Sequence, residues 1–424
     1  VTGTNDAPTV TSVLTVDADE GGSLLYLDLL SLTSDVDLND TLSLSNMSAL
    51  PAGLTLSGSV LSVDPSDASF SGLTAGQTTQ IVVTYDVIDG QGGSIAQTAT
   101  VTVTGNTDPV AVADSIYTTT NSIRVDDFVL TANDTDVDSA DTLFVSSAAP
   151  LTGGYTVTDG TDEVTVSGIT GDGSFTYQTD DSNGGQNTGT VTVTYVNTNT
   201  LSGNFMNNII IGGSGDETLS GLAGNDTLYG EGGDDSLLGG NDADMFFGGD
   251  GDDTLDGGSG SDTVNYSRRS EALSVDLDTG VVIVSGGETD TLISIENVIG
   301  SDYDDTIVGG GSDANELEGG LGDDILTGNA DADTFIYSSI SDGNDTITDF
   351  DVGEADIIDL DALFDALGIA GVSRDEDVVL TDAGADTVLT IDSQAGFSIT
   401  LTGVDLDVTS ETTLRAQINV GDES

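Results

Sequence analysis

A nine-residue period between residues 212 and 265 restricts the fold of this chain more than any other feature. The segment divides without a gap into six lines: GGSGDETLS, GLAGNDTLY, GEGGDDSLL, GGNDADMFF, GGDGDDTLD and GGSGSDTVN. The sixth position is acidic in every line: Glu217, Asp226, Asp235, Asp244, Asp253 and Asp262. The eighth is apolar in every line: Leu219, Leu228, Leu237, Phe246, Leu255 and Val264. Six consecutive lines in one register indicate a stacked repeat architecture.

The period predicts a parallel β-roll. Glycine at positions one, two and four allows a tight turn with positive φ, and the last three residues of each line can extend as a short strand. Two lines then make one coil, and the eighth side chains point into a thin core. Lines two apart stack on each other. This places Glu217, Asp235 and Asp253 at one edge and Asp226, Asp244 and Asp262 at the other.

Stacked carboxylates of this kind predict bound calcium. Like charges at a parallel-strand spacing of ~4.8 Å repel one another unless a cation lies between them. Calcium prefers carboxylate and carbonyl oxygens, and the repeat supplies both. The sixth-position residues are therefore the candidate metal ligands. Non-glycine residues at Leu222, Glu231 and Asp242, and glutamate at Glu217, depart from the pattern and predict a weaker first coil.

A second block of lines follows, at 300–308, 310–318, 319–327 and 328–336. Its sixth positions, which are further candidate ligands, are Asp305, Asn315, Asp324 and Asp333. Asn315 is expected to be a poorer ligand because its amide carries no charge. The interruption between the blocks, 266–299, alternates like strands and could continue the stack. Within it, Arg268 and Arg269 are expected to form salt bridges with neighbouring carboxylates.

Charge and composition limit the remaining classes of function. The chain has 75 acidic and 5 basic residues, a net charge of −70, and 36% hydrophobic residues. Nucleic acid and anionic membranes would repel it, and the short alternating apolar runs favour a folded chain over a disordered one. It contains no Cys and no His, which excludes disulfides, zinc fingers, histidine triads and HExxH metalloprotease sites. No apolar run is long enough for a transmembrane helix.

The first two hundred residues predict two β-sandwich modules. VTGTNDAPTV at 1–10 is echoed by VTGNTDPVAV at 103–112, a spacing typical of immunoglobulin-like sandwiches. Acidic clusters lie at 34–40, 133–142 and 179–185. In the second cluster the candidate calcium ligands are Asp134, Asp136 and Asp138. For any one cluster, a solvated loop and a calcium site remain equal alternatives.

Beyond Ile336 the period is expected to be lost. Residues 356–369 predict a short helix with Asp361 as its N-cap and Gly368 as its end, and 386–404 predict a hairpin. A polar cap of this kind would terminate the solenoid.

Several of these segments resemble known families. The nonads are similar to repeat-in-toxin (RTX) calcium-binding repeats, which implies that the sixth carboxylates bind calcium together with turn carbonyls. Residues 69–105 resemble VCBS repeats, and 129–148 with 171–180 resemble the cadherin-like repeats of bacterial adhesins. These imply spacer or adhesive modules outside the cell. Residues 331–363 resemble the C-terminal region of RTX proteins that type I systems export.

Together these observations predict an all-β chain: two Ig-like or cadherin-like sandwich modules, then a calcium-bound parallel β-roll and a small, mostly β C-terminal cap. The expected domains are 1–106, 107–199, 200–337 with the interruption at 266–299, and 338–424. The expected function is the non-enzymatic C-terminal portion of a secreted or surface adhesin active in biofilms, with several calcium ions, the type I machinery and a glycan or protein ligand as partners.

Two other classes of function remain open. One is the non-catalytic tail of a secreted RTX enzyme, and the other is a sugar- or peptide-binding module within the sandwich region. The chain begins without Met and without signal-peptide character, so it is expected to be a piece of a longer protein. It is also expected to be a monomer.

Overall fold

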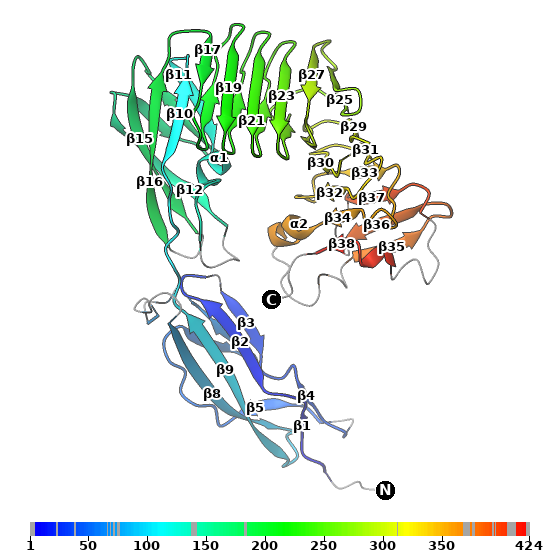
Figure 1. Cartoon of the computed structure of the whole chain (residues 1–424). Helices are drawn as coiled ribbons and strands as arrows, with labels where there is room; N and C mark the ends of the chain where they lie inside the picture. The colour runs from blue at the N-terminus through cyan, green and yellow to red at the C-terminus, as the bar shows by residue number, and fades with distance from the viewer. Residues whose placement is uncertain are drawn as a thin grey trace. The chain divides into compact units, whose positions relative to one another are not determined.

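The computed structural model describes residues 5–420 except 23, 38–39, 66, 68, 71–72, 74–76, 137–141, 182–184, 312, 368–373, 375–377, 392–393, 395 and 405–412. The chain forms two compact units. The first comprises Val1–Ala113, Arg124–Val166 and Ser174–Val191, and the second comprises Asp114–Ile123, Ser167–Gly173 and Thr192–Ser424. Figure 1 shows the course of the chain through both. Almost all regular structure is β, as the sequence predicts.

The first unit begins with a sandwich of two sheets in which most neighbouring strands are antiparallel. One sheet has the order β2 (Leu14–Asp19), β9 (Ser94–Thr104), β8 (Thr78–Ile88) and β5 (Ser43–Ser45). The other has the order β3 (Leu25–Asp28), β7 (Val60–Val63) and β6 (Leu54–Ser57), while β1 (Thr9–Val10) pairs with β4 (Thr33–Ser34). Alternating residues of β8 and β9, such as Val83, Val101 and Val103, are buried between the sheets.

The next module uses the same alternation. Its strands are β12 (Phe144–Thr152), β15 (Gly173–Asp180) and β16 (Gln186–Tyr195) in one sheet, and β11 (Ser122–Asp126), β14 (Glu163–Ser167) and β13 (Thr156–Asp159) in another. A short helix, α1 (Asp127–Thr131), follows β11. Phe175 and Tyr177 on β15 are fully buried because every second residue of that strand faces the core.

The second unit is a parallel β-roll with two sheets. Roll sheet 1 has the order β10 (Asp114–Thr118), β18 (Ile209–Ile211), β20 (Thr227–Tyr229), β22 (Met245–Phe247), β24 (Thr263–Asn265), β28 (Asn297–Ile299), β30 (Glu316–Glu318), β32 (Thr334–Ile336), β34 (Ile357–Asp359) and β38 (Ile418–Asn419). Successive nonads supply strands to the two sheets alternately, so each pair of nonads completes one coil.

Roll sheet 2 has the order β17 (Thr200–Ser202), β19 (Thr218–Ala223), β21 (Ser236–Asn241), β23 (Thr254–Ser259), β27 (Thr289–Ile293), β26 (Val281–Val284), β25 (Leu273–Asp276), β29 (Thr306–Val308), β31 (Ile325–Thr327), β33 (Asn344–Ile347), β37 (Ser398–Leu401), β36 (Thr387–Ile391) and β35 (Val378–Asp382). The interruption continues both sheets, with β25, β26 and β27 in this one and β28 in roll sheet 1, and β26 runs antiparallel to both neighbours. The hairpin predicted at 386–404 is formed by β36 and β37.

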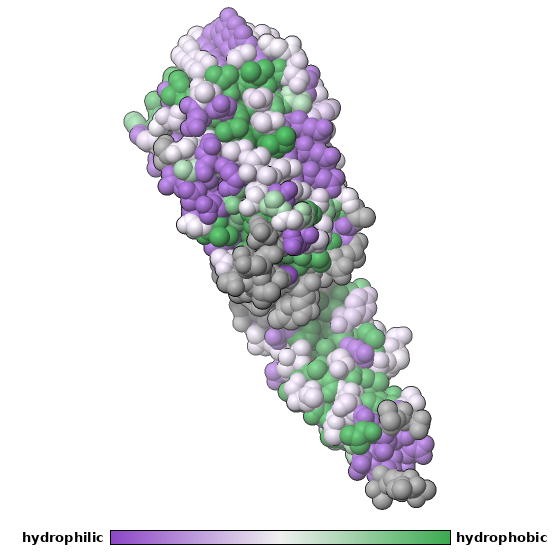
Figure 2. Space-filling view, turned by 90° about the vertical axis from the view of Figure 1, so that its right-hand side faces the viewer, coloured by the Kyte–Doolittle hydropathy of each residue, from purple (hydrophilic) through white to green (hydrophobic). Residues whose placement is uncertain are grey.

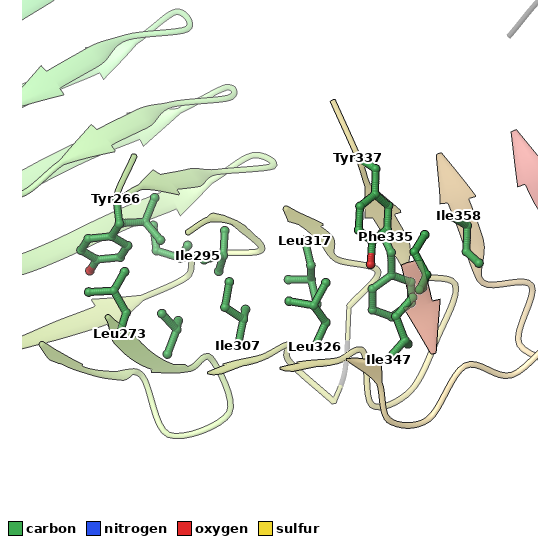
Figure 3. Packing of buried hydrophobic residues seen from close by; sticks show 14 of the residues in the cluster. Tyr266, Leu273, Ile295, Ile307, Leu317, Leu326, Phe335, Tyr337, Ile347 and Ile358 are labelled. Carbon is green, nitrogen blue, oxygen red and sulfur yellow. The ribbon is translucent and has the colours of Figure 1, made fainter. Parts of the chain in front are cut away.

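The eighth-position side chains form the core of the roll, as predicted. Leu219, Leu237 and Leu255 are consecutive partners in roll sheet 2, and all three are fully buried. Figure 3 shows the same arrangement further along, where Leu317, Phe335 and Ile358 face Ile307, Leu326 and Ile347 across the core. Each short strand contributes one such side chain, so the core is only one side chain deep from each sheet.

Two predictions about the repeat are corrected by the structure. Positive φ occurs at positions two and four, for example Gly249 (97°) and Gly251 (129°), but not at position one. The roll also does not end at residue 337: the nine-residue period is lost after Ile336, as predicted, but β33 and β34 continue both roll sheets in parallel with β31 and β32. An insertion of three residues hides this continuation: the next stacked acid lies 21 residues on instead of 18.

The C-terminal helix is close to its prediction. α2 (Asp361–Ala366) begins at Asp361 itself, and Leu363 and Phe364 are fully buried in the core of the roll. The predicted end at Gly368 lies outside the described residues.

Candidate calcium ladder

Each sixth-position residue lies in the turn just before a strand, and all of them are buried despite their charge. Asp226, Asp253 and Asp262 are at most 1% exposed. Burying a carboxylate without a compensating partner is costly, so the contacts of each oxygen decide what the site can do.

One carboxylate oxygen of each aspartate is held by the backbone of the preceding coil. The backbone N–H of a sixth-position residue donates to Oδ1 of the acid 18 residues later. The donor and acceptor pairs are Asn208 and Asp226 (2.7 Å), Glu217 and Asp235 (2.7 Å), Asp226 and Asp244 (2.8 Å), Asp235 and Asp253 (2.9 Å), and Asp244 and Asp262 (2.8 Å). In the second block Asn315 donates to Asp333 in the same way (2.9 Å), and Asp305 donates to Asp324 across 19 residues (2.7 Å). The predicted stacking of alternate nonads is therefore confirmed.

The other oxygen, Oδ2, is buried and has no hydrogen-bond partner. This holds for Asp226, Asp235, Asp244, Asp253, Asp262, Asp324 and Asp333. The first-position glycine of the same nonad leaves room for it. A Cβ on Gly230 would lie 2.5 Å from Oδ2 of Asp235 and would overlap the carbonyl oxygen of Gly248 in the next coil. Glycine is therefore required at position one for close approach rather than for a positive φ.

A calcium ion fits this arrangement. Carboxylate and backbone carbonyl oxygens converge beside first-position glycines such as Gly212, Gly221 and Gly230, and these are the ligand types that calcium prefers. When bound, the ion would neutralise the stacked carboxylates. No arginine neutralises Asp226, Asp235 or Asp244 among the ion pairs of the described residues.

Burial changes the protonation of the ladder when it is free of metal. Burial raises the pKa of Asp226 to about 8 and the pKa of Asp235, Asp244, Asp253, Asp324 and Asp333 to about 7, and neighbouring carboxylates add to the effect. For Asp262 the value is about 6, again with burial as the main cause. These carboxylates resist ionisation near neutral pH unless a cation compensates them.

Three predicted ligands differ from the other seven. Oε2 of Glu217 accepts the N–H of Gly213 at 3.0 Å. Both oxygens of Asp305 are occupied, because Oδ2 accepts the N–H of Ser301 and Oδ1 accepts that of Leu273. In Asn315, Nδ2 donates to the carbonyl of Glu296 at 2.7 Å. These three residues remain predicted ligands, but they lack the unpartnered oxygen of the others.

Four acids outside the nonads continue the same ladder and were missed by the sequence analysis. Asp290, Glu296, Asp345 and Asp356 accept the backbone N–H groups of Asp253, Asp262, Asp324 and Asp333, respectively. An acid placed two residues before the inward-facing residue of a strand is the signal they share with the nonads: Asp290 precedes Leu292, and Asp345 precedes Ile347.

The acidic loops of the first unit hold their carboxylates in other ways. Asp134 is buried, and its carboxylate accepts hydrogen bonds from the Tyr177 hydroxyl (3.0 and 3.1 Å) and from the N–H of Val112 (2.6 Å). Asp136 lies two residues further along the chain, and Asp138 lies outside the described residues. A calcium site here stays a prediction.

In the structure, an aspartate from elsewhere in the chain lies beside the acidic cluster at 34–40. Oxygens of Asp35, Asp40 and Asp89 lie within 4.8 Å of one another. Asp89 itself is held by backbone N–H groups at 91–93 and by the side chain of Asn5. The solvated-loop and calcium-site alternatives both remain for this cluster.

Both arginines of the interruption form the expected salt bridges. Arg269 contacts Asp250 (3.2 Å) and Glu288 (2.9 Å), and Arg268 lies 4.0 Å from Glu231. Arg268 also covers the stacked rings of Tyr229 and Phe247.

Comparisons with known proteins agree with this geometry. The family model of the RTX calcium-binding nonapeptide repeat matches residues 197–228, 211–246, 229–264, 294–313 and 310–339. A bacterial Ig domain model matches 106–194, and a cadherin-like domain model matches 4–104. The roll is thus a β-roll of RTX calcium-binding repeats, which hold several calcium ions, preceded by Ig-like and cadherin-like modules. The three matches together fit a C-terminal region of a bacterial RTX adhesin.

Similar solved structures include the lipase LipA from Serratia marcescens, at 18% identity and a TM-score of 0.21, covering 55% of this chain and 44% of that one. The human desmocollin-1 ectodomain matches at 13% identity and a TM-score of 0.22, covering 47% and 45%. The chain therefore spans less than half of either protein, and scores this low establish no shared function. Among curated proteins no match was found.

The matched domains are structural ones, consistent with a non-enzymatic, extracellular or surface-exposed region. In the described part of the chain, no helix has both the length and the apolar character needed to span a bilayer.

Proposed function

We propose that this chain is the calcium-assembled C-terminal portion of an adhesin that a type I system exports, with the sandwich modules as extenders. The observation that carries this proposal is the ladder of seven buried aspartates whose Oδ2 atoms have no partner. A roll built in this way is poorly stable without calcium and well stabilised with it. The cytosol, where calcium is scarce, would therefore hold an export-competent chain, and folding would follow outside the cell.

The energetics support this division between compartments. A site contributes roughly 1.4 kcal/mol at a free calcium concentration ten times its dissociation constant. Extracellular calcium modules typically bind at about 10⁻⁴ to 10⁻³ M. Several such sites together rival the whole stability of a small domain, about 5–15 kcal/mol.

Circular dichroism of the whole chain tests the calcium part of the proposal. We expect β signal to increase when millimolar calcium is added to chelated protein, because the roll folds while the sandwich modules are already folded. Identical spectra in calcium and in chelator would contradict it.

A fusion experiment tests export. Residues 338–424 joined to a passenger protein should be secreted by cells carrying a type I exporter, whereas residues 212–337 on the same passenger should not. Equal secretion of both fusions, or of neither, would remove the assignment of the export signal to the C-terminal segment.

Adhesion would use the surface of the sandwich modules. Figure 2 shows hydrophobic residues interspersed with hydrophilic ones on one face of the molecule. In the first module Val13, Tyr26 and Val36 are more than 60% exposed. A glycan or protein ligand is the expected partner, and binding of the full chain to cells, compared with the chain lacking residues 1–106, tests this role.

A further inference from the structure

A buried tyrosine comes directly after the last nonad of each block. Tyr266 directly follows the line 257–265, and Tyr337 directly follows the line 328–336. Both occupy the place that a first-position glycine would take in a further nonad. They are 2% and 1% exposed. Each is close to an acid that continues the ladder outside the nonads, Asp290 for the first block and Asp345 for the second.

The end of the first block is satisfied by protein groups. The hydroxyl of Tyr266 donates to Oδ2 of Asp290 at 2.9 Å, and Oδ1 accepts the N–H of Asp253. The side chain of Arg269 is only 9% exposed and lies close enough to lower the pKa of Asp290, against the larger opposing effect of burial. Both oxygens thus have partners, and a positive charge is nearby.

The end of the second block also has a buried tyrosine, Tyr337, and a ladder acid, Asp345. Their polar atoms are not all hydrogen-bonded as those of the first block are. Oδ1 of Asp345 accepts the N–H of Asp324 at 2.8 Å, but Oδ2 is buried and has no hydrogen-bond partner. The hydroxyl of Tyr337 is likewise buried and unpartnered. Figure 3 shows this hydroxyl directed away from its own strand toward the opposite sheet, which carries Asp345. Burial, followed by the charges of Asp345, Asp324 and Asp342, raises the pKa of Tyr337.

A second buried acid, Asp342, lies near Tyr337 at this end, where the first block has an arginine. Asp342 is 3% exposed, and its Oδ2 accepts the N–H groups of Ser338 (3.0 Å) and Ser339 (2.9 Å). Neither Asp342 nor Asp345 forms an ion pair with any arginine of the described residues. Two buried carboxylates and an unpartnered hydroxyl therefore share one region that lacks a positive charge.

We propose that Asp345, Asp342 and the Tyr337 hydroxyl hold a calcium ion that lies beyond the repeats. Two of these residues follow the last residue matched by the repeat model, 339, and the first-position glycine of the nonads is replaced here by tyrosine. All three side chains offer oxygen ligands, which are the ligands that a hard divalent cation such as calcium prefers. The inference rests on the proposed calcium-dependent assembly of the roll.

The ion would fasten the C-terminal segment to the roll. The segment with Asp342 in its turn and Asp345 on β33 also contacts β37, because Ser398 donates its N–H to the carbonyl of Gly343 (3.1 Å) and its hydroxyl to Asn344 (2.9 Å). Ordering this segment around an ion would order the strand pairing of β33 with β37. The alternative is that Asp345 is protonated and no ion binds.

Native mass spectrometry of the full chain in calcium distinguishes these alternatives. Asp345→Asn keeps the oxygen that accepts the Asp324 N–H and removes the charge, so we expect one bound calcium fewer than in the unmodified chain. The control is Asp382→Asn, an exposed aspartate of β35 outside the ladder whose Oδ1 accepts the N–H of Gly384, for which we expect an unchanged count. An unchanged count for Asp345→Asn would overturn the site. If the unmodified chain bound no calcium at all, the proposed function would fail instead.

Terbium luminescence provides a second readout that depends on the tyrosine. The chain has no Trp, so terbium bound in place of calcium would be sensitised by tyrosines close to it. We expect Tyr337→Phe to lower the sensitised emission, Asp345→Asn to lower it as much, and the double variant to lower it no further. Emission unchanged in Tyr337→Phe, with circular dichroism matching the unmodified chain, would contradict the assignment of the hydroxyl to the site.

Discussion

At the scale of single residues, the sixth-position aspartate divides its two oxygens between the backbone and the metal. Oδ1 of Asp235 fixes the preceding coil through the N–H of Glu217, and Oδ2 is left for calcium. An asparagine Oδ1 could accept the same backbone N–H, but an asparagine has no negative charge with which to bind calcium. This explains why an acid occupies this position in nine of the ten nonads.

The raised pKa values predict how stability without metal depends on pH. In the unfolded chain an aspartate has a pKa of about 3.9. In the folded roll the pKa of Asp226 is about 8 and that of Asp324 about 7, mainly because of burial. Between these values the folded state binds more protons than the unfolded state, so the free energy of unfolding falls as pH rises.

Urea unfolding in chelator should therefore show a roll that is more stable at about pH 5.5 than at about pH 8. Saturating calcium should reverse the trend, because the ligands must lose their protons to bind it. A metal-free roll that gains stability with rising pH would contradict the buried, unpaired state of these carboxylates.

The first-position glycine gives a second prediction at this scale. Gly230→Ala places a Cβ against Oδ2 of Asp235 and the carbonyl of Gly248, so it should displace two calcium-facing oxygens. We expect a loss of ~1–3 kcal/mol in the free energy of unfolding in calcium, the usual range for overpacking. Gly286→Ala is the matched control, because no atom lies within 4 Å of its Cβ and its φ is not positive. Equal effects of the two substitutions in calcium titrations would contradict this role.

At the scale of elements, each strand of the roll is two to six residues long and contributes little core of its own. Leu237 on β21 pairs with Leu219 and Leu255 in the stack and is fully buried, whereas Leu238 beside it is 38% exposed. The strand is held by the coils before and after it, so its packing depends on their calcium sites.

A pair of adjacent substitutions measures this packing. Leu237→Ala should cost ~2–5 kcal/mol of stability in saturating calcium, as expected for a truncated buried leucine. Leu238→Ala should stay within about 0.5 kcal/mol of the unmodified chain. Thermal unfolding followed by circular dichroism would check both, and similar losses for the two would show that the inward direction of position eight is misassigned.

The sequence predicted the elements wherever the period is strict. From Glu217 to Val264 the stacking, the inward residues and the buried acids are all visible in the nine-residue spacing. It did not predict β33 or β34, because the insertion before Asp345 shifts the register. It also did not distinguish Asp305 from Asp324, since the contacts of Ser301 and Leu273 with Asp305 arise from tertiary packing.

At the scale of the whole molecule, the net charge of −70 opposes compaction, and the four arginines of the second unit are too few to balance its acids. Calcium is therefore coupled to folding, and so to the compartment in which folding takes place. The sandwich modules differ because they have hydrophobic cores between two sheets, such as that around Val101 and Tyr85. We expect them to remain folded in chelator.

The most direct test is a crystal structure of the chain grown in calcium, with anomalous diffraction data that locate the ions. The account predicts anomalous peaks beside Oδ2 of Asp226, Asp235, Asp244, Asp253, Asp262, Asp324 and Asp333. An intact roll with no peak beside these atoms would show that the coils are held together by something other than metal.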